Sequence, residues 1–371
     1  MKIIFIGGRD IHALGGIETY MRNLASELVK LGHVPIVYCE SDRNKEEWYN
    51  GFLVIHQKSY KSNLFCKPIL GLKATIHSLI NIKDADIYHY NAWPPSLWVW
   101  IPRMFGKTAL MQGHGFEWRR TKYSIFQQKI IKFMEYLVIH INNHLLMVSQ
   151  EQSDFFLLHY KRICTTIPTA VYLPSSLKIE SDICKRFNLE INDYYLYLGR
   201  LVQEKNPDIL IKAFKQSGIK NKKLVIAGSN DMMPEYVKTL KLLADNNDIV
   251  FTGAVYGIDK EALLLNCFVF CIPSTVEGLS ITLFEAMSYH KPIIASDILS
   301  NREGLGNNGI WVKAEDVNDL SNKLIYCIDN SRIIESKGEL NYHRVADNFT
   351  WDIVVKKYVS YVDSIRNKAK P

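Results

Sequence analysis

The sequence predicts an α/β protein with two doubly wound domains, each built around a parallel sheet. Short, continuously apolar runs alternate with longer segments whose apolar residues recur every three or four positions, and this series occurs twice along the chain. Continuous apolar runs, unlike alternating ones, are typical of strands that helices cover on both faces of a parallel sheet. A length of 371 residues also suits two domains.

The first half contains six short apolar runs that predict strands. Its clearest helix lies between the first two runs, over residues 17–31, and Gly32 ends it. The predicted strands are Ile3–Ile6, Pro35–Cys39, Phe52–Ile55, Ile87–Tyr90, Thr108–Met111 and Leu145–Val148.

The second half repeats this rhythm with six further runs. Helical segments such as Pro207–Lys215 and Ile258–Leu265 separate them. The predicted strands are Tyr194–Leu198, Leu224–Ala227, Ile249–Phe251, Phe268–Ile272, Pro292–Ala295 and Ile310–Val312.

A cluster of proline and serine in Pro168–Ser176 predicts the boundary between the halves. We therefore expect domains at residues 1–173 and 174–350, followed by a closing segment, 351–371, that is helical over Trp351–Asn367. Ligands of open parallel sheets bind beyond the carboxyl ends of the strands, so two such domains predict a site in the cleft between them.

The composition is that of an ordinary globular chain. It is 47% hydrophobic and 22% charged, which excludes disorder and collagen-like structure. No apolar stretch reaches the ~18 residues that a membrane-spanning helix needs. The seven cysteines are scattered and odd in number, which favours reduced thiols and a cytoplasmic protein. Cys267 and Cys271 flank an apolar run, and we expect buried thiols there rather than a metal pair.

The net charge of +7 lies entirely in the first half. Residues 1–173 carry 20 basic and 13 acidic side chains, whereas the remainder carries 25 of each. A basic surface favours anionic partners, which include nucleic acid, anionic lipid and phosphorylated substrates. Nucleic acid ranks last because no known binding module with clustered aromatic residues is present.

The first candidate site is the loop that begins with Gly7-Gly8 and ends with Gly15-Gly16. It joins the first predicted strand to the clearest helix. Glycines let a ligand approach the backbone, and the free N–H groups of a helix N-terminus attract phosphate. The spacing is neither G-x-G-x-x-G nor a P-loop, so it indicates neither nicotinamide nor a Walker-type nucleotide. A tight structural turn is the alternative.

The second candidate is the loop after the strand Tyr194–Leu198. Arg200 and Lys205 lie on it, just before a helix that Pro207 helps to begin. Two cations at the carboxyl end of a strand suit a diphosphate. The alternative is a solvated surface pair.

The third candidate follows the strand Phe268–Ile272. Glu277 lies in the loop, Gly278–Ser280 form the entrance of a helix, and Glu285 lies about two turns further on. Carboxylates can accept hydrogen bonds from sugar hydroxyls, and entrance N–H groups can hold an anion. The alternatives are a helix N-terminal charge for Glu277 and a surface position for Glu285. Apolar neighbours surround Glu285, so we expect it to need a polar partner.

Taken together, these motifs closely resemble those of the family 4 retaining glycosyltransferases, which have the GT-B fold. Gly15-Gly16-Ile17-Glu18, Gly199-Arg200 with Lys205, and Glu277 with Glu285 (the E-x7-E pattern) occur in the order of that family. Residues 112–118 also look like its His-Gly loop. The resemblance spans almost the whole chain and extends, more loosely, to bacterial enzymes that build surface polysaccharides such as O-antigen or capsule.

The resemblance implies a hexosyltransferase that transfers a sugar from a nucleoside-diphosphate sugar without a metal or other cofactor. The closing segment would be the helix that crosses back onto the first domain. The implied catalytic residues are Arg200 and Lys205 on the diphosphate, Glu277 on the sugar hydroxyls and His114 near the sugar. The implied donor-binding residues are Gly15, Gly16, Gly278, Leu279, Ser280 and, for the ribose, Glu285.

Two features depart from the family pattern or compete with it. Residues 168–171 read Pro-Thr-Ala-Val where the family often has Pro-Asn-Gly-Val, which we interpret as loop variation. Asp84-Ala85-Asp86 matches the D-x-D motif of metal-dependent transferases of another fold. It precedes a predicted strand instead of following one, so we do not expect a metal there.

The acceptor is expected on the first domain, where residues 119–137 combine basic and apolar side chains at helical spacing. The cationic members are Arg119, Arg120, Lys122, Lys129 and Lys132, and the apolar ones Ile125, Phe126, Ile130, Phe133, Met134 and Leu137. This pattern is typical of a helix that lies on a membrane, although a core-packing helix with a charged outer face also fits it. With the charge of this half, it suggests peripheral contact with the inner face of the cytoplasmic membrane and a lipid-linked glycan acceptor.

Two other functions fit parts of the pattern. A sugar-nucleotide epimerase of the same fold would share the donor site but would act without an acceptor. A non-catalytic glycan-binding subunit would normally have lost a cation or a glutamate of the set, and this chain keeps all four.

Overall fold

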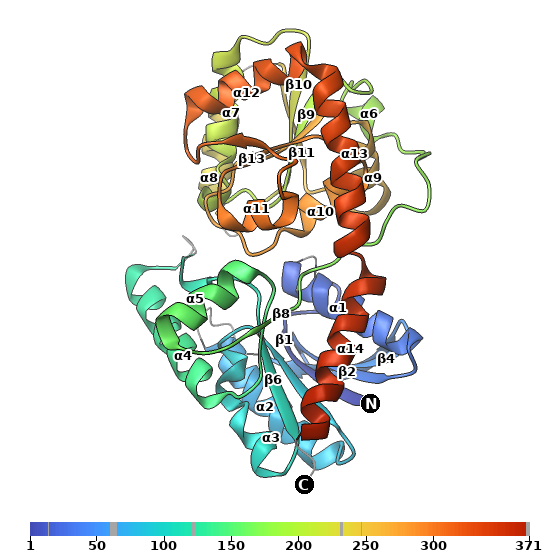
Figure 1. The fold of residues 1–371 in the computed structure, drawn as a ribbon, viewed down its shortest axis with the longest axis vertical. Coiled ribbons are helices and arrows are strands. Elements are labelled where there is room, and N and C mark those ends of the chain that lie inside the picture. The colour runs from blue at the N-terminus through green and yellow to red at the C-terminus, as the bar shows by residue number, and fades with distance from the viewer. Residues whose placement is uncertain (14, 60–64, 120–122, 231–232, 246, 369–371) are drawn as a thin grey trace. The chain divides into compact units, whose positions relative to one another are not determined.

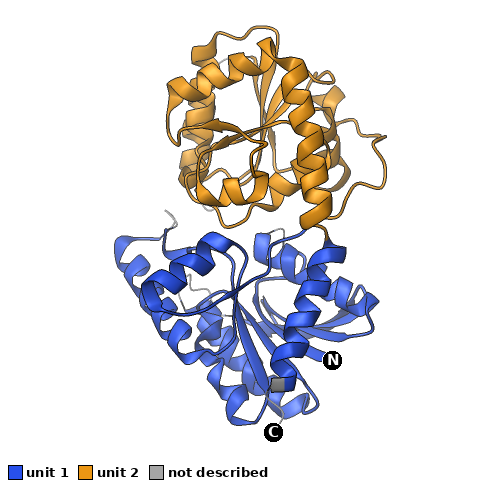
Figure 2. Cartoon of the chain, in the orientation of Figure 1, with its two compact units in different colours: residues 1–170, 351–371 blue, residues 171–350 orange. Residues whose placement is uncertain are grey.

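The chain forms two compact units. The computed structural model describes residues 1–13, 15–59, 65–119, 123–230, 233–245 and 247–368. Unit 1 consists of residues 1–170 together with 351–371, and unit 2 of residues 171–350 (Figure 2). The chain therefore leaves unit 1 once and returns to it with its last helix.

The described residues of unit 1 contain one eight-stranded sheet. Its strands are β1 (Lys2–Gly8), β2 (Val34–Ser41), β3 (Lys45–Tyr49), β4 (Phe52–Lys58), β5 (Ile87–Asn91), β6 (Thr108–Gly113), β7 (Leu145–Met147) and β8 (Thr165–Thr166). Their order across the sheet is β3-β4-β2-β1-β5-β6-β7-β8. All neighbours run parallel except β3 and β4, which form an antiparallel hairpin at one edge.

All six strands predicted for the first half are present, but two further strands were not predicted. The edge strand β3 alternates half-buried with exposed side chains, and Glu46 and Trp48 are the exposed ones. It therefore lacks the continuous apolar run of a buried parallel strand. The other, β8, has only two residues, which is too short for a pattern.

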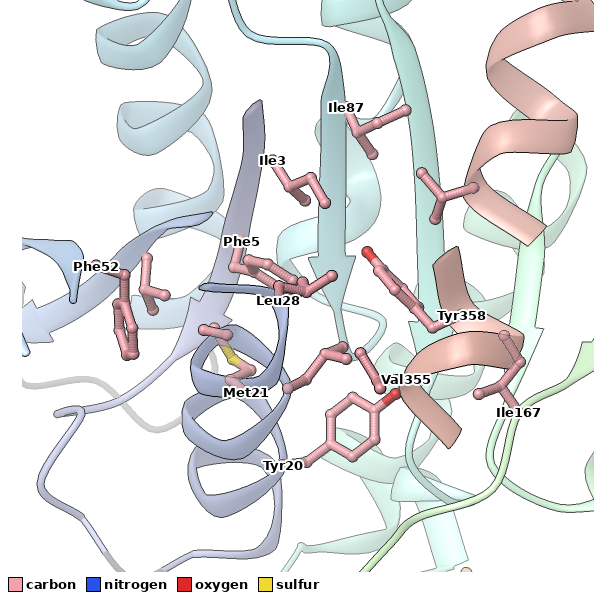
Figure 3. Packing of buried hydrophobic residues seen from close by; sticks show 14 of the residues in the cluster. Ile3, Phe5, Tyr20, Met21, Leu28, Phe52, Ile87, Ile167, Val355 and Tyr358 are labelled. Carbon is pink, nitrogen blue, oxygen red and sulfur yellow. The ribbon is translucent and has the colours of Figure 1, made fainter. Parts of the chain in front are cut away.

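Helices cover both faces of this sheet, as a doubly wound fold requires (Figure 1). The helical elements of unit 1 are α1 (Gly16–Lys30), α2 (Cys66–Asn81), η1 (Pro95–Trp98), α3 (Trp100–Met104), η2 (Glu117–Arg119), α4 (Ile125–Ile141), α5 (Gln150–Tyr160) and α14 (Trp351–Lys368). The alternation of side chains along β1 divides the core. Ile3 and Phe5 pack with α1 and α14 (Figure 3), whereas Ile4 and Ile6 pack with α2 on the other face.

Unit 2 has a six-stranded sheet in its described part, and every neighbouring pair is parallel. Its strands are β9 (Tyr194–Leu198), β10 (Lys223–Ala227), β11 (Ile249–Gly253), β12 (Val269–Ile272), β13 (Ile293–Ser296) and β14 (Ile310–Val312), in the order β11-β10-β9-β12-β13-β14. Its helical elements are α6 (Ile183–Arg186), η3 (Gln203–Lys205), α7 (Pro207–Ser217), α8 (Pro234–Leu243), α9 (Gly257–Asn266), α10 (Ile281–Ser288), α11 (Leu299–Leu305), α12 (Val317–Asp329) and α13 (Ser331–Asn348). All six predicted strands are confirmed.

Two sequence-based expectations about the whole chain can be compared with this fold. Within the described ranges, no helix combines the length and the apolar character needed to cross a bilayer. All seven cysteines are free, and Cys267 and Cys271 are buried, as expected.

Candidate functional site

The strand order of unit 2 places its candidate site. From β9 the chain proceeds to β10 and β11 on one side, and then returns to β12 on the other side of β9. Strands β9 and β12 therefore flank the topological switch point, where the loops that follow them diverge and leave a crevice for ligands. The loop after β9 carries Arg200 and Lys205, and the loop after β12 carries Glu277.

Lys205 and Glu277 meet at this point. The Nζ atom of Lys205 donates to Oε1 of Glu277 at 2.9 Å, and the two side chains are only 16% and 10% exposed. Ser274 Oγ donates to the same oxygen at 2.7 Å. A largely desolvated ion pair holds both ends in fixed positions, so a cation and a carboxylate predicted for one site do lie together.

Two hydrogen bonds to backbone carbonyls bind the two loops to each other. Asn206 adopts a left-handed conformation (φ 50°) and donates from Nδ2 to the carbonyl of Pro273 at 3.0 Å. The amide of Thr275 donates to the carbonyl of Glu204 at 2.9 Å. These contacts tie the segment around Lys205 to the segment before Glu277, so the ion pair does not depend on side chains alone.

Arg200 is exposed on the same loop as Lys205. Within the described part of the chain its guanidinium makes no hydrogen bond or ion pair. Its carbonyl accepts from the hydroxyl of Tyr197 at 2.8 Å, and burial raises the pKa of Tyr197 well above its usual range, which keeps that donor protonated. The backbone of Arg200 is thus fixed while its charge is available to an anionic ligand.

Glu285 has the polar partner that its apolar surroundings called for. Its Oε1 accepts from Nζ of Lys260, on α9, at 2.7 Å. Both side chains are about three-quarters buried, at 27% and 21% exposure. The switch-point side of unit 2 thus contains a second cation–carboxylate pair, formed between α9 and α10.

Among the described residues, no side chain caps the entrance of α10 at its N-cap residue. Ser280 is the N-cap residue in an extended conformation, and its side chain makes no capping hydrogen bond; its hydroxyl lies 3.0 Å from that of Thr282. Leu279 is buried and anchors the entrance. The predicted anion-binding role of the Gly278–Ser280 amides stays a prediction, and the uncapped helix entrance is compatible with it.

In unit 1 the glycine loop lies at the corresponding switch point, between β1 and β5. The carboxylate of Glu18 is buried and accepts from the amide of Arg9 at 3.1 Å, so the helix holds the start of its own entry loop. A Cβ on Gly15 would lie 2.1 Å from Oε2 of Glu18, whereas a Cβ on Gly16 would meet nothing within 4 Å. A side chain at Gly15 would displace the Glu18 carboxylate that holds the amide of Arg9, and Gly16 presents open backbone. Leu14 lies outside the described residues.

His114 contacts α1, the helix that follows the glycine loop. Its Nε2 lies 2.9 Å from Oδ1 of Asn91, the last residue of β5, and its ring packs against Tyr20 of α1 with centroids 5.1 Å apart. The hydroxyl of Tyr20 in turn accepts from Gln112 Nε2 at 3.0 Å. The His-Gly loop and the first helix are therefore coupled by direct side-chain contacts.

The D-x-D sequence is used for structure. Asp84 pairs with Lys2, while Asp86 accepts from the backbone amide of Lys2 at 2.8 Å and pairs with Arg366 of α14 at 2.8 Å. Over the described ranges, no three His, Cys, Asp or Glu side chains are grouped so that they could hold a metal ion.

The two halves of the chain match two glycosyltransferase family models. Residues 14–173 match "Glycosyltransferase Family 4", and residues 183–342 match "Glycosyl transferases group 1". The chain belongs to the family 4 glycosyltransferases. The resemblance inferred from the motifs is thereby confirmed.

Relatives of this glycosyltransferase include enzymes with lipid-linked substrates. An uncharacterized glycosyltransferase of Methanocaldococcus jannaschii is 25% identical, with 94% of each chain covered. The N,N'-diacetylbacillosaminyl-diphospho-undecaprenol alpha-1,3-N-acetylgalactosaminyltransferase of Campylobacter jejuni is 25% identical over 49% of this chain and 47% of that enzyme. The GDP-mannose-dependent monoacylated alpha-(1-6)-phosphatidylinositol monomannoside mannosyltransferase of Corynebacterium glutamicum is 26% identical over 57% of this chain and 61% of that enzyme.

Solved structures establish the fold of the glycosyltransferase. Sucrose-phosphate synthase from Thermosynechococcus elongatus superposes with a TM-score of 0.84 at 18% identity, covering 99% of both chains. Anabaena HepE in complex with UDP-glucose superposes with a TM-score of 0.79 at 17% identity, covering 98% of this chain and all of that one. The predicted GT-B fold is confirmed.

Sequence reasoning about the glycosyltransferase missed Lys260. Arg200 and Glu277 lie in loops that follow strands, which is a signal that can be read along the chain. Lys260 lies on the helix α9 and approaches Glu285 only through tertiary packing. Its spacing of 25 residues from Glu285 has no helical or strand period. The expectation that Glu285 needs a polar partner was the one available signal, and it named no residue.

Proposed function

We propose that this glycosyltransferase retains the configuration at the anomeric carbon and works without a metal ion, using a nucleoside-diphosphate sugar as donor. The observation that carries the proposal is the Lys205–Glu277 pair with Arg200 on the same loop. Bond cleavage leaves negative charge on the departing diphosphate, and fixed cations lower that barrier. Arg200, Lys205 and the Gly278–Ser280 amides supply positive charge where a metal would otherwise be needed.

The ion pair also explains how one site can bind both a phosphate and a sugar. When a diphosphate binds, Nζ of Lys205 can donate to it in place of Glu277. The carboxylate of Glu277 can then accept hydrogen bonds from sugar hydroxyls. Glu285 is assigned to the ribose. In unit 1, the amides of Gly15 and Gly16 and the imidazole of His114 are assigned to the phosphate and sugar of the donor.

The chemical step follows from the absence of an evident dedicated base among the motif residues. The acceptor oxygen attacks the anomeric carbon on the face from which the diphosphate leaves, so a C–O bond forms as the C–O bond to phosphate breaks. The departing phosphate oxygen takes the proton of the acceptor hydroxyl. Charge-assisted hydrogen bonds of ~1.5–3 kcal/mol each stabilise the leaving group.

The test is a panel of nucleotide sugars screened first by thermal stabilisation and then by turnover. We expect one donor to raise the melting temperature, to be hydrolysed slowly, and to give a product with retained anomeric configuration by NMR, with unchanged rate in EDTA. An inverted product or a requirement for divalent metal would contradict the proposal. Conversion of the donor to an epimer without acceptor would favour the epimerase, and stabilisation without any turnover the binding subunit.

We further propose that the acceptor is a lipid-linked glycan of a surface polysaccharide and that α4 contacts the inner face of the cytoplasmic membrane. The relatives named for undecaprenol and phosphatidylinositol substrates support this choice. So does the helix surface: Ile125, Phe126 and Phe133 are 75%, 73% and 60% exposed and share one face with Lys129 and Lys132. Of the remaining basic residues, Arg120 and Lys122 lie outside the described residues.

A buried carboxyl leaves this face of α4 positive. Glu135 is the one acidic residue of the helix, and its side chain is fully buried. Burial raises its pKa to about 8, an effect that Trp118, Lys132 and Arg119 only partly offset. At pH 7 the helix therefore presents lysine charge without a compensating carboxylate, which suits anionic lipid.

We expect the protein to sediment with vesicles that contain anionic lipid and to stay in the supernatant with neutral vesicles. Replacing Phe126 and Phe133 with serine should lower the bound fraction severalfold, because exposed aromatic side chains supply the apolar part of the contact. The matched control is Leu242→Ser, an 80% exposed apolar side chain on α8 of unit 2, which should leave binding unchanged. Equal recovery in both supernatants would refute the membrane contact.

A further inference from the structure

The β3–β4 hairpin brings two histidines to one carboxylate. Oε1 of Glu47, on the edge strand β3, lies 2.8 Å from Nε2 of His56 on β4 and 2.9 Å from Nε2 of His12. Nζ of Lys45 lies 3.5 Å from the other oxygen. No part of the proposed reaction uses this cluster.

The geometry defines the proton positions. An ionised carboxylate only accepts hydrogen bonds, so each imidazole must carry a proton on the Nε2 atom that faces Glu47. Burial acts to raise the pKa of Glu47, but the hydrogen bonds from His56 and His12 outweigh it and hold the pKa below its usual range. The side chain of His56 is fully buried and serves as the fixed end of the cluster, whereas that of His12 is 54% exposed.

His12 belongs to the loop that joins β1 to α1 and leads to Gly15 and Gly16. Two hydrogen bonds that involve side chains of α1 also hold this loop. Arg22 Nη1 donates to the carbonyl of Ile11 at 3.1 Å, and the amide of Arg9 donates to Glu18. Within the described residues, the side-chain hydrogen bond that ties the loop to a different part of the sheet is the one from His12 to Glu47.

We propose that Glu47 is a positioning residue that fixes the glycine loop through His12, so that the edge hairpin sets the affinity of the donor at Gly15 and Gly16. The inference rests on the proposed function. A loop held in place before binding does not have to be ordered by the ligand, and that ordering otherwise weakens affinity. The ring of Tyr49, whose centroid is 5.5 Å from that of His12, adds packing to the same contact.

Two variants of neighbouring glutamates provide the test. Glu47→Gln removes the charge that both imidazoles face. Glu46→Gln removes the charge of the preceding residue, which is exposed on the other face of the same strand. We expect hydrogen exchange of residues 9–13, measured without substrate, to be about 3–10-fold faster in Glu47→Gln than in the wild type and unchanged in Glu46→Gln. The KM for the donor should rise by a similar factor with kcat within about twofold, because the loss is of binding rather than of transition-state stabilisation.

A conservative pair separates the hydrogen bond from mere filling of space. His12→Gln keeps an N–H that can reach Glu47 and should recover part of the donor affinity that His12→Ala loses. Equal exchange and equal KM in the Glu47→Gln and Glu46→Gln proteins would overturn the inference. A third outcome is possible: exchange is faster in Glu47→Gln, but the wild-type protein binds no nucleotide sugar. That result would support the contact between Glu47 and the loop, and it would overturn both the role of Glu47 in donor binding and the proposed function.

Discussion

Lys205→Ala should lower kcat by about 100–1000-fold while the protein stays folded. That factor is the usual effect of removing one fixed group that stabilises charge in a transition state. Nζ of Lys205 lies 2.9 Å from Glu277 and is largely shielded from water, so its charge is held in place before the donor arrives. The change leaves Glu277 its hydrogen bond from Ser274 and leaves the backbone contacts between the two loops untouched.

Lys212→Ala is the matched control for Lys205→Ala. Lys212 lies on the adjoining helix α7 and also pairs with a carboxylate at 2.9 Å, that of Asp208, but it is 45% exposed. Exposed pairs of this kind contribute ~0–1 kcal/mol, so its loss should change neither the melting temperature nor turnover measurably. Circular dichroism and steady-state kinetics on the two variants measure the difference. If Lys205→Ala turned over at the wild-type rate, the lysine would have no role in the mechanism.

The fold was predictable because the strands of a doubly wound protein leave a strong local signal. Twelve predicted strands and the helix Trp351–Asn367, seen as α14, are present in the structure. The strand β3 was missed because an edge strand faces water along one side and so lacks a continuous apolar run. Its omission also hid Glu47, since nothing in the sequence indicates that this glutamate lies beside His12.

The candidate site was predictable where its residues directly follow strands. Lys205 and Glu277 are 72 residues apart, yet the rule that parallel strands present their carboxyl ends at one edge brings them to the same crevice. The same rule cannot reveal Lys260, because a residue within a helix is placed by the rotation and packing of that helix. The ion pair between Lys260 and Glu285 is therefore a property of the packed unit 2 and not of any segment.

Trp351→Ala should destabilise unit 1 by about 3–5 kcal/mol, the usual effect of truncating a buried tryptophan. Trp351 begins α14 at 2% exposure, and its ring lies 5.6 Å from that of Tyr20 on α1. Further along the helix, Val355 and Tyr358 pack into the same core (Figure 3), and the Tyr358 hydroxyl lies 2.8 Å from Nδ1 of the buried His89. The end of the chain thus completes the core of the unit in which it began.

The loss should be confined to unit 1, which distinguishes it from a general weakening of the chain. Hydrogen exchange should accelerate in α1, β1 and β5 and stay unchanged in β9, β10 and β12, because Trp351 belongs to the core of unit 1. The control is Trp48→Ala, the same truncation at a position that is 75% exposed on β3. In this control the free energy of unfolding, measured in urea, should change by less than ~1 kcal/mol.

Because Tyr20 also packs against His114, the Trp351 variant should lose activity before it loses its fold as urea is added. Uniform acceleration in both units, or a loss as small as that of Trp48→Ala, would show that α14 is not an integral part of unit 1.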